Sequence, residues 1–188
     1  MENTYELNGK TLKIVQDDNS GESPREWDGN ISTLVIFGSY SHLGDKHNFV
    51  LDGNSEDEDT AIIERDKNVV HVQPIYGYSH SGLTISLSPF SCPWDSGVMG
   101  FLVITKDKIR ECYGVKRVTK KLIAKAIESA KGEIETLDQY ITGDIYGFEI
   151  TDEDDNHVDS CYGFYGSDIN TNGILDYIDD EWKKVINN

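Results

Sequence analysis

The feature that constrains the fold most is a set of apolar residues between Leu122 and Ile141 that recurs with the period of an α-helix. A helix with one apolar stripe must bury that stripe against another layer of structure. Thr119 stands where an N-terminal cap is needed, and Gly143 is suited to stop the helix. We therefore predict a long helix over about residues 119–142. Its stripe consists of Leu122, Ile123, Ala126, Ile127, Ala130, Ile134, Leu137 and Ile141.

Most other apolar segments are short and rich in β-branched residues, which favours strands. The run from Val98 to Ile104 is almost continuously apolar and predicts a central strand. Two hairpins are predicted. One joins Val69–Tyr78 to Leu83–Leu87 through the turn His80-Ser81-Gly82, and the other joins Tyr146–Ile150 to Val158–Tyr165 through the acidic stretch 151–156. Polar loops are expected over 17–30 and 52–59. The predicted strands are Thr11–Val15, Ser32–Phe37, Val69–Tyr78, Leu83–Leu87, Val98–Ile104, Tyr146–Ile150 and Val158–Tyr165.

A second helix is expected from about residue 173 to 186, with Ile174, Ile178, Trp182 and Val185 buried. The pattern as a whole predicts the α+β class, with an antiparallel or mixed sheet that carries the two helices. A chain of 188 residues fits one domain, so we expect a single domain over 1–188.

The beginning of the sequence lacks the basic start and apolar stretch of a signal peptide. The longest apolar run is far too short to span a bilayer. Three cysteines, Cys92, Cys112 and Cys161, leave an odd thiol and no paired framework. We therefore expect a cytoplasmic protein that does not enter a membrane.

Charge is the most informative total, because 34 acidic residues outnumber 17 basic ones and give a net charge of −17. Residues 1–105 and 132–188 are strongly acidic, whereas 106–131 carry nine basic and three acidic residues. Such a surface repels phosphate backbones, so no direct nucleic-acid binding is expected. It attracts proteins with a basic working surface, although solubility alone also explains it. The carboxylates expected to meet a partner are Glu56, Asp57, Glu58 and Asp59 in one loop and Asp152, Glu153, Asp154 and Asp155 in another.

The charges of the long helix run against its dipole, which favours acids at the start and bases at the end. Lys116, Arg117, Lys120 and Lys121 crowd the start, and Glu133, Glu135 and Asp138 lie toward the end. Two explanations stay open. The cations pair with the acidic stretch 152–155 of the chain itself, or an anionic partner docks on them.

The sequence from Asp168 onward matches the pattern of a calcium loop, because oxygen-bearing side chains alternate around a glycine as calcium-binding loops require. The twelfth position is Asp179 rather than the longer glutamate, and a strand-like segment precedes the loop instead of a helix. We expect no cofactor and a turn that caps the last helix, with calcium binding as the alternative. The candidate ligands are Asp168, Asn170, Asn172, Asp176 and Asp179.

The segment Ser88–Gly97 concentrates two prolines, two aromatic residues, Cys92 and Asp95 in one loop. With His80 near the preceding turn, one interpretation is a nucleophilic arrangement of Cys92, His80 and Asp95. A packed structural loop is the alternative, and scattered histidines and cysteines show no strong zinc spacing. Common nucleotide-binding and hydrolase motifs do not occur in the sequence. We expect a protein without catalytic activity, with a metal-dependent or cysteine-based enzyme as the alternative.

Five segments in their order resemble a family of small acidic proteins carried by bacteriophages, prophages and plasmids, and the similarity covers roughly residues 20–170. The segment Ser88–Gly97 is the most specific. The others are Glu22–Asp28, Leu43–His47, Thr142–Phe148 and Asp159–Gly166. The resemblance implies a mobile element in a bacterial cytoplasm, and it implies no catalytic residues.

Setting and charge together predict an accessory protein that inhibits a host nucleic-acid-targeting defence enzyme of the restriction or CRISPR type. Its carboxylates would stand in for phosphates and occupy the basic cleft of that enzyme. The expected partner is thus a basic nucleic-acid-binding host protein. A cysteine-based or metal-dependent enzyme and a calcium-stabilised accessory protein remain the alternatives.

Overall fold

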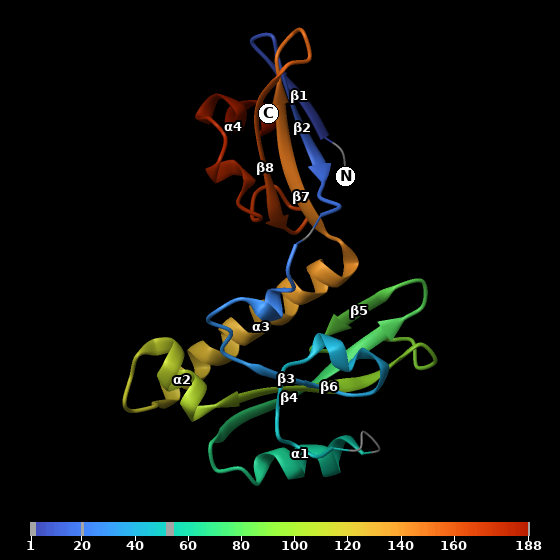
Figure 1. Cartoon of the computed structure of the whole chain (residues 1–188), viewed down its shortest axis with the longest axis vertical. Helices are drawn as coiled ribbons and strands as arrows, with labels where there is room; N and C mark the ends of the chain where they lie inside the picture. The colour runs from blue at the N-terminus through green and yellow to red at the C-terminus, as the bar shows by residue number, and fades with distance from the viewer. Residues whose placement is uncertain (1–2, 20, 52–54, 188) are drawn as a thin grey trace. The chain divides into compact units, whose positions relative to one another are not determined.

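The computed structural model describes residues 3–19, 21–51 and 55–187, and its chain divides into two compact units. The terminal unit joins the two ends of the chain, Met1–Glu22 and Gln139–Asn188, and the central unit is Ser23–Asp138. Each unit contains a four-stranded sheet in which every neighbouring pair of strands is antiparallel (Figure 1). The predicted α+β class is confirmed. The single domain expected over 1–188 stays a prediction.

The sheet of the terminal unit has the strand order β1-β2-β7-β8. Its core face carries Leu12, Ile14, Phe148 and Ile150, which pair across β2 and β7. Ile174 and Trp182 pack onto this face from the C-terminal segment. The elements of this unit are β1 (Asn3–Leu7), β2 (Lys10–Gln16), β7 (Ile145–Thr151), β8 (His157–Tyr165), the 3-10 turn η3 (Ile174–Asp176) and α4 (Asp180–Ile186).

The sheet of the central unit has the strand order β3-β6-β4-β5, and Figure 1 shows α1 and α3 on opposite sides of it. Phe101 clusters with Ile63 of α1, whereas the adjacent Leu102 points to the opposite face. Both side chains are buried, which explains the continuous apolar run of β6. The strands are β3 (Thr33–Ile36), β4 (Val69–Ser79), β5 (Leu83–Ser86) and β6 (Ser96–Thr105). The helical segments are η1 (Pro24–Glu26), η2 (Gly38–Leu43), α1 (Glu56–Glu64), α2 (Lys106–Tyr113) and α3 (Lys120–Thr142).

All seven predicted strands and both hairpins form, and β6 is a central strand. The predicted long helix is confirmed as α3. Thr119 caps it as expected, because its hydroxyl oxygen accepts a hydrogen bond from the Leu122 N–H at 3.3 Å. The C-terminal helix is also confirmed, but it is shorter than expected. Gly173, with a φ of 96°, precedes a 3-10 turn, and Asp179 has extended backbone with a ψ of 151°, so the helix begins only at Asp180.

The loop expected over 52–59 is wrong in its second half, because residues 56–59 form the first turn of α1. Residues 52–54 lie outside the described part of the chain. Ser55 caps this helix by accepting a hydrogen bond from the Glu58 N–H at 3.3 Å. Ser55 followed by Glu58 three residues later has the spacing of a capping box, which marks the start of a helix. Strand β1 and helix α2 were not predicted either.

Candidate functional site

The two units differ sharply in charge. The segments of the terminal unit hold 17 acidic and four basic residues, a net charge of −13. The central unit holds 17 acidic and 13 basic residues, a net charge of −4. Most of the excess negative charge of the chain therefore belongs to one compact unit.

The turn between β7 and β8 presents the acidic residues 152–155. Glu153, Asp154 and Asp155 are exposed, whereas Asp152 organises the turn from a half-buried position. Its Oδ1 accepts hydrogen bonds from the N–H groups of Asp154 and Asn156, each at 2.9 Å. Hydrogen bonds from Asn156, chiefly from its side-chain amide, lower the pKa of Asp152. Three carboxylates thus face solvent on a turn that the fourth holds in shape.

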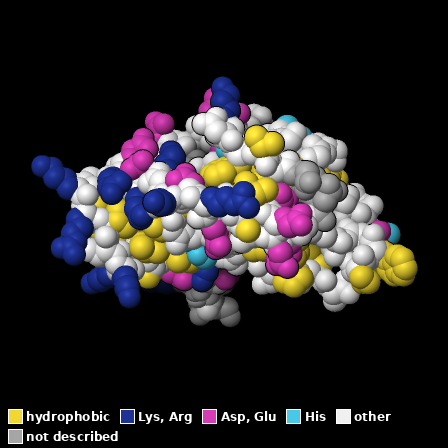
Figure 2. Space-filling view, turned by 90° about the horizontal axis from the view of Figure 1, so that it is seen from below, with side chains coloured by type: hydrophobic (Ala, Val, Ile, Leu, Met, Phe, Trp, Pro, Cys, Tyr) yellow, Lys and Arg dark blue, Asp and Glu magenta, His cyan; other side chains and the backbone are white. Residues whose placement is uncertain are grey.

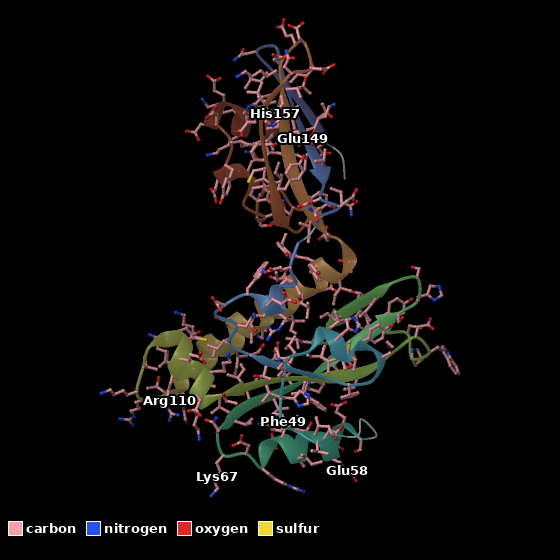
Figure 3. All side chains as sticks on the ribbon, viewed as in Figure 1. Phe49, Glu58, Lys67, Arg110, Glu149 and His157 are labelled. Atoms are coloured by element: carbon pink, nitrogen blue, oxygen red, sulfur yellow. The ribbon has the colours of Figure 1, made fainter. Side chains whose placement is uncertain are left out.

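The second acidic group lies at the start of α1, where Glu56, Asp57 and Glu58 are exposed. Figure 3 shows Glu58 at this end of the helix. Asp59 is only 1 % exposed, so its expected place on the exposed surface is wrong. The cause is the helical turn, which directs Asp59 to the same buried side as Ile63 four residues later.

Basic residues gather at one end of the central unit. Figure 2 shows Lys and Arg side chains collected at the left, where α2 and the connection to α3 lie. Lys116, Arg117, Lys120 and Lys121 are all exposed there. Within the described part of this unit, no carboxylate forms an ion pair with any of the four. The two explanations given for these cations stay predictions.

Two of the three acidic residues near the end of α3, Glu133 and Asp138, have a structural explanation. Glu133 accepts hydrogen bonds from the N–H groups of Ile31 and Ser32 ahead of β3, at 2.5 and 3.2 Å. Asp138 accepts from the hydroxyl of Thr84 and the N–H of Ile85 on β5, both at 2.7 Å. Both carboxylates therefore attach α3 to edges of the central sheet, whose N–H groups need partners.

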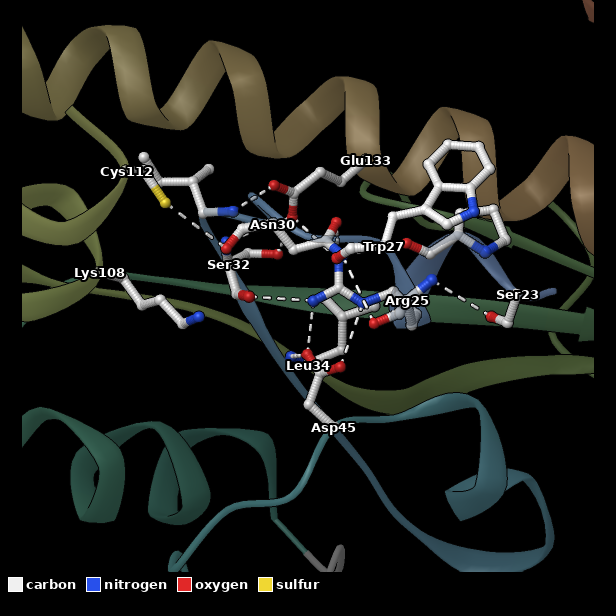
Figure 4. A network of polar contacts seen from close by, with 12 residues as sticks. Ser23, Arg25, Trp27, Asn30, Ser32, Leu34, Asp45, Lys108, Cys112 and Glu133 are labelled. Atoms are coloured by element: carbon white, nitrogen blue, oxygen red, sulfur yellow. Dashed lines mark hydrogen bonds and ion pairs between the residues drawn. The ribbon is translucent and has the colours of Figure 1, made fainter.

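Glu133 also belongs to a buried network around Arg25, which Figure 4 shows. The Arg25 guanidinium, whose side chain is 6 % exposed, donates to Glu133 at 2.9 Å and to Asp45 at 2.5 and 3.3 Å. It also donates to the Ser32 carbonyl at 2.9 Å. Arg25 thus joins its own segment to Ser32, to Asp45 and to Glu133 of α3. The segments 22–28 and 43–47, which contain Arg25 and Asp45, are two of the five that carry the resemblance.

Cys112 lies beside this network. Its Sγ is 3.6 Å from the Gly29 carbonyl oxygen and 3.8 Å from that of Asn30, and burial raises the pKa of the thiol. A thiol with a raised pKa is a poor nucleophile at neutral pH. The contacts of Cys112 are thus two weak hydrogen bonds to backbone carbonyls beside the Arg25 network.

The structure does bring Cys92, His80 and Asp95 together, where the loop between β5 and β6 lies against the turn of the β4–β5 hairpin. Asp95 Oδ2 lies 3.7 Å from Cys92 Sγ and 3.3 Å from His80 Nδ1. The carboxylate of Asp95 thus contacts both Cys92 and His80. A nucleophilic thiol requires the imidazole beside the sulfur, and the described residues show no Cys92–His80 hydrogen bond. The contacts fit a fixed loop better than an activated cysteine.

The acidic residues after β8 form a compact turn. Asp168 Oδ1 accepts from the N–H and the side-chain amide of Asn170, at 3.0 and 3.1 Å, and these bonds lower the pKa of Asp168. The side-chain amide of Asn172 donates through Nδ2 to the Gly166 carbonyl, and its Oδ1 accepts from the Ile174 N–H. Among the described residues, no group of three or more His, Cys, Asp or Glu side chains is placed to hold a metal ion. The calcium site at Asp168, Asn170, Asn172, Asp176 and Asp179 stays a prediction.

No helix in the described ranges is both long and apolar enough to span a membrane. In comparisons with known proteins, no family model, no curated protein and no solved structure matches the chain. The resemblance to proteins of phages and plasmids therefore stays a prediction, and the site has to be interpreted from its own geometry.

Proposed function

We propose that the protein binds a basic, nucleic-acid-binding protein through its carboxylates and inhibits it without catalysis. The observation that carries this proposal is the concentration of a net −13 in the terminal unit. The electrostatic field of this negative charge attracts a positively charged partner to the surface and raises the rate of association.

The turn 152–155 is the best-defined part of this surface. Glu153, Asp154 and Asp155 are exposed, and Asp152 fixes the turn through three hydrogen-bond donors, the N–H groups of Asp154 and Asn156 and the Asn156 amide. A turn that is ordered before binding loses little conformational entropy when a partner docks. Fixed carboxylates of this kind are suited to take the place of phosphates in a basic cleft.

In the bacterial cytoplasm that the resemblance implies, the partner would be a restriction or CRISPR enzyme carried by the host. Such an enzyme has a cleft that binds DNA or guide RNA, and occupying that cleft would protect invading DNA. The exposed acids at the start of α1 would form a second contact of the same chemistry.

The proposal is tested by immobilising the protein, capturing partners from a bacterial lysate and measuring competition with DNA or RNA for the captured protein. The decisive variant combines Glu153→Gln, Asp154→Asn and Asp155→Asn. It keeps Asp152, and asparagine tolerates the φ of 60° at position 155. We expect association to slow by roughly 3- to 10-fold and to depend less on salt.

A matched control combines Glu111→Gln, Glu128→Gln and Glu135→Gln, which removes the same charge from exposed helix positions of the central unit. We expect this control to bind almost as the parent does. If the turn variant competes with nucleic acid as well as the parent does, the turn is not the mimic. A captured partner that DNA and RNA cannot displace would refute mimicry altogether.

A further inference from the structure

The loop between β5 and β6 presents the most exposed large apolar side chain that the structure describes. Trp94 is 91 % exposed, more than Val50 at 86 % and far more than Trp27 at 46 %. An indole in water is costly, and tryptophan is enriched among the residues that dominate binding energies. Residues 88–97, which comprise most of this loop and the first two residues of β6, form the Trp94 loop and are a candidate binding surface.

Several contacts hold the Trp94 loop in one conformation. The carbonyl of Asp95 accepts from the Ser79 N–H at 2.9 Å, and the Ser96 hydroxyl donates to the Cys92 carbonyl at 2.5 Å. The ring of Phe90 packs against Tyr78 with centroids 5.6 Å apart. Pro93 further restricts the backbone just before the indole. The side chain of Trp94 is thus exposed on a preorganised support.

A carboxylate lies next to the indole in the chain. The side chain of Asp95 is 39 % exposed, and its contacts with Cys92 and His80 both use Oδ2. Among the described residues, Oδ1 of Asp95 has no hydrogen-bond partner. An aromatic face and an accessible carboxylate oxygen are the two groups that recognise a guanidinium, which stacks on the ring and donates to the oxygen.

We propose that Trp94 and Asp95 form a recognition site for an arginine side chain of the basic partner. This inference rests on the proposed function and adds to it a specific contact in the central unit. Charge complementarity favours this occupant, because a chain of net charge −17 concentrates cationic partners around itself. Arginine suits the site better than lysine, since a planar, weakly hydrated guanidinium stacks on indole.

The test uses two fluorescein-labelled peptides, eight arginines and eight lysines, whose affinities are measured by anisotropy at 0.15 M salt. The parent should prefer the arginine peptide. Trp94→Leu keeps an apolar side chain without the aromatic face and should weaken arginine-peptide binding by about 2- to 5-fold, more than it weakens the lysine peptide. Trp94→Phe should restore part of the preference.

Val50→Ala removes another exposed apolar side chain of the central unit and should change neither affinity. A second measurement uses the Trp27→Phe background, in which Trp94 remains exposed and Trp182 is 4 % exposed. Unlabelled arginine peptide should shield Trp94 fluorescence from acrylamide quenching. Unchanged quenching, or equal affinity of the parent and Trp94→Leu for the arginine peptide, would overturn the site.

The two proposals fail in different ways. If the turn variant at 153–155 weakens both peptides while Trp94→Leu weakens neither, charge attraction stands and the arginine site is wrong. If Trp94→Leu removes the arginine preference while the turn variant binds both peptides as the parent does, the arginine site stands and the acidic turn has no role.

Discussion

At the scale of single residues, the buried guanidinium of Arg25 forms ion pairs with both Asp45 and Glu133 in the central unit. Its removal would leave the carboxylates of Asp45 and Glu133, whose side chains are 22 % and 14 % exposed, without their cation. We expect Arg25→Met to lower the free energy of unfolding by about 3 kcal/mol, because uncompensated buried charges are costly. Urea unfolding followed by circular dichroism measures this change.

Arg110→Met is the matched control, since Arg110 pairs with Asp107 at the surface, where side-chain exposures are 43 % and 71 %. Exposed ion pairs contribute about 0–1 kcal/mol, so this variant should unfold almost as the parent does. Equal midpoints for the two variants would show that the Arg25 network contributes no more than a surface pair.

At the scale of elements, α3 is attached to the central sheet by an apolar stripe and by two carboxylates. Ile134 is 3 % exposed, and we expect Ile134→Asp to destabilise the protein by several kcal/mol because it buries an unpaired charge. Ile127 is only half-buried, so Ile127→Asp should cost less. The neighbouring exposed position provides a control, Glu135→Asp, which should be nearly neutral. A thermal melt of Ile134→Asp that coincides with that of Glu135→Asp would contradict the packing of α3.

At the scale of the whole molecule, repulsion among like charges opposes the folded state, and the terminal unit carries most of it. We expect the melting temperature to rise when sodium chloride is increased from 0.01 to 0.3 M, since the Debye length falls from about 30 Å to below 8 Å. Calorimetry measures this shift. The variant neutralised at 153–155 should show a smaller rise than the control neutralised at 111, 128 and 135. A melting temperature independent of salt would mean that the acidic residues are too well solvated to repel one another.

Much of the fold follows from local pattern. The stripe from Leu122 to Ile141 predicts α3, and the apolar run from Val98 to Ile104 predicts β6, because both periodicities arise from backbone geometry. The acidic turn at 151–156 likewise predicts the β7–β8 hairpin. The candidate acids at 153–155 and 56–58 are exposed as expected, whereas burial of Asp59 depends on a helix whose capping box went unrecognised.

Which distant residues meet depends on tertiary packing. The α+β class, the long helix and the excess of acid follow from the sequence, since each depends on composition or on neighbours along the chain. The sequence could not assign Arg25 to Asp45 and Glu133, 20 and 108 residues away, nor assign most of the negative charge to one unit built from both ends of the chain. The sequence likewise does not show that Asp95 contacts both Cys92 and His80. Such pairings depend on how strands and helices pack, and packing brings together residues whose separation along the chain carries no periodic signal.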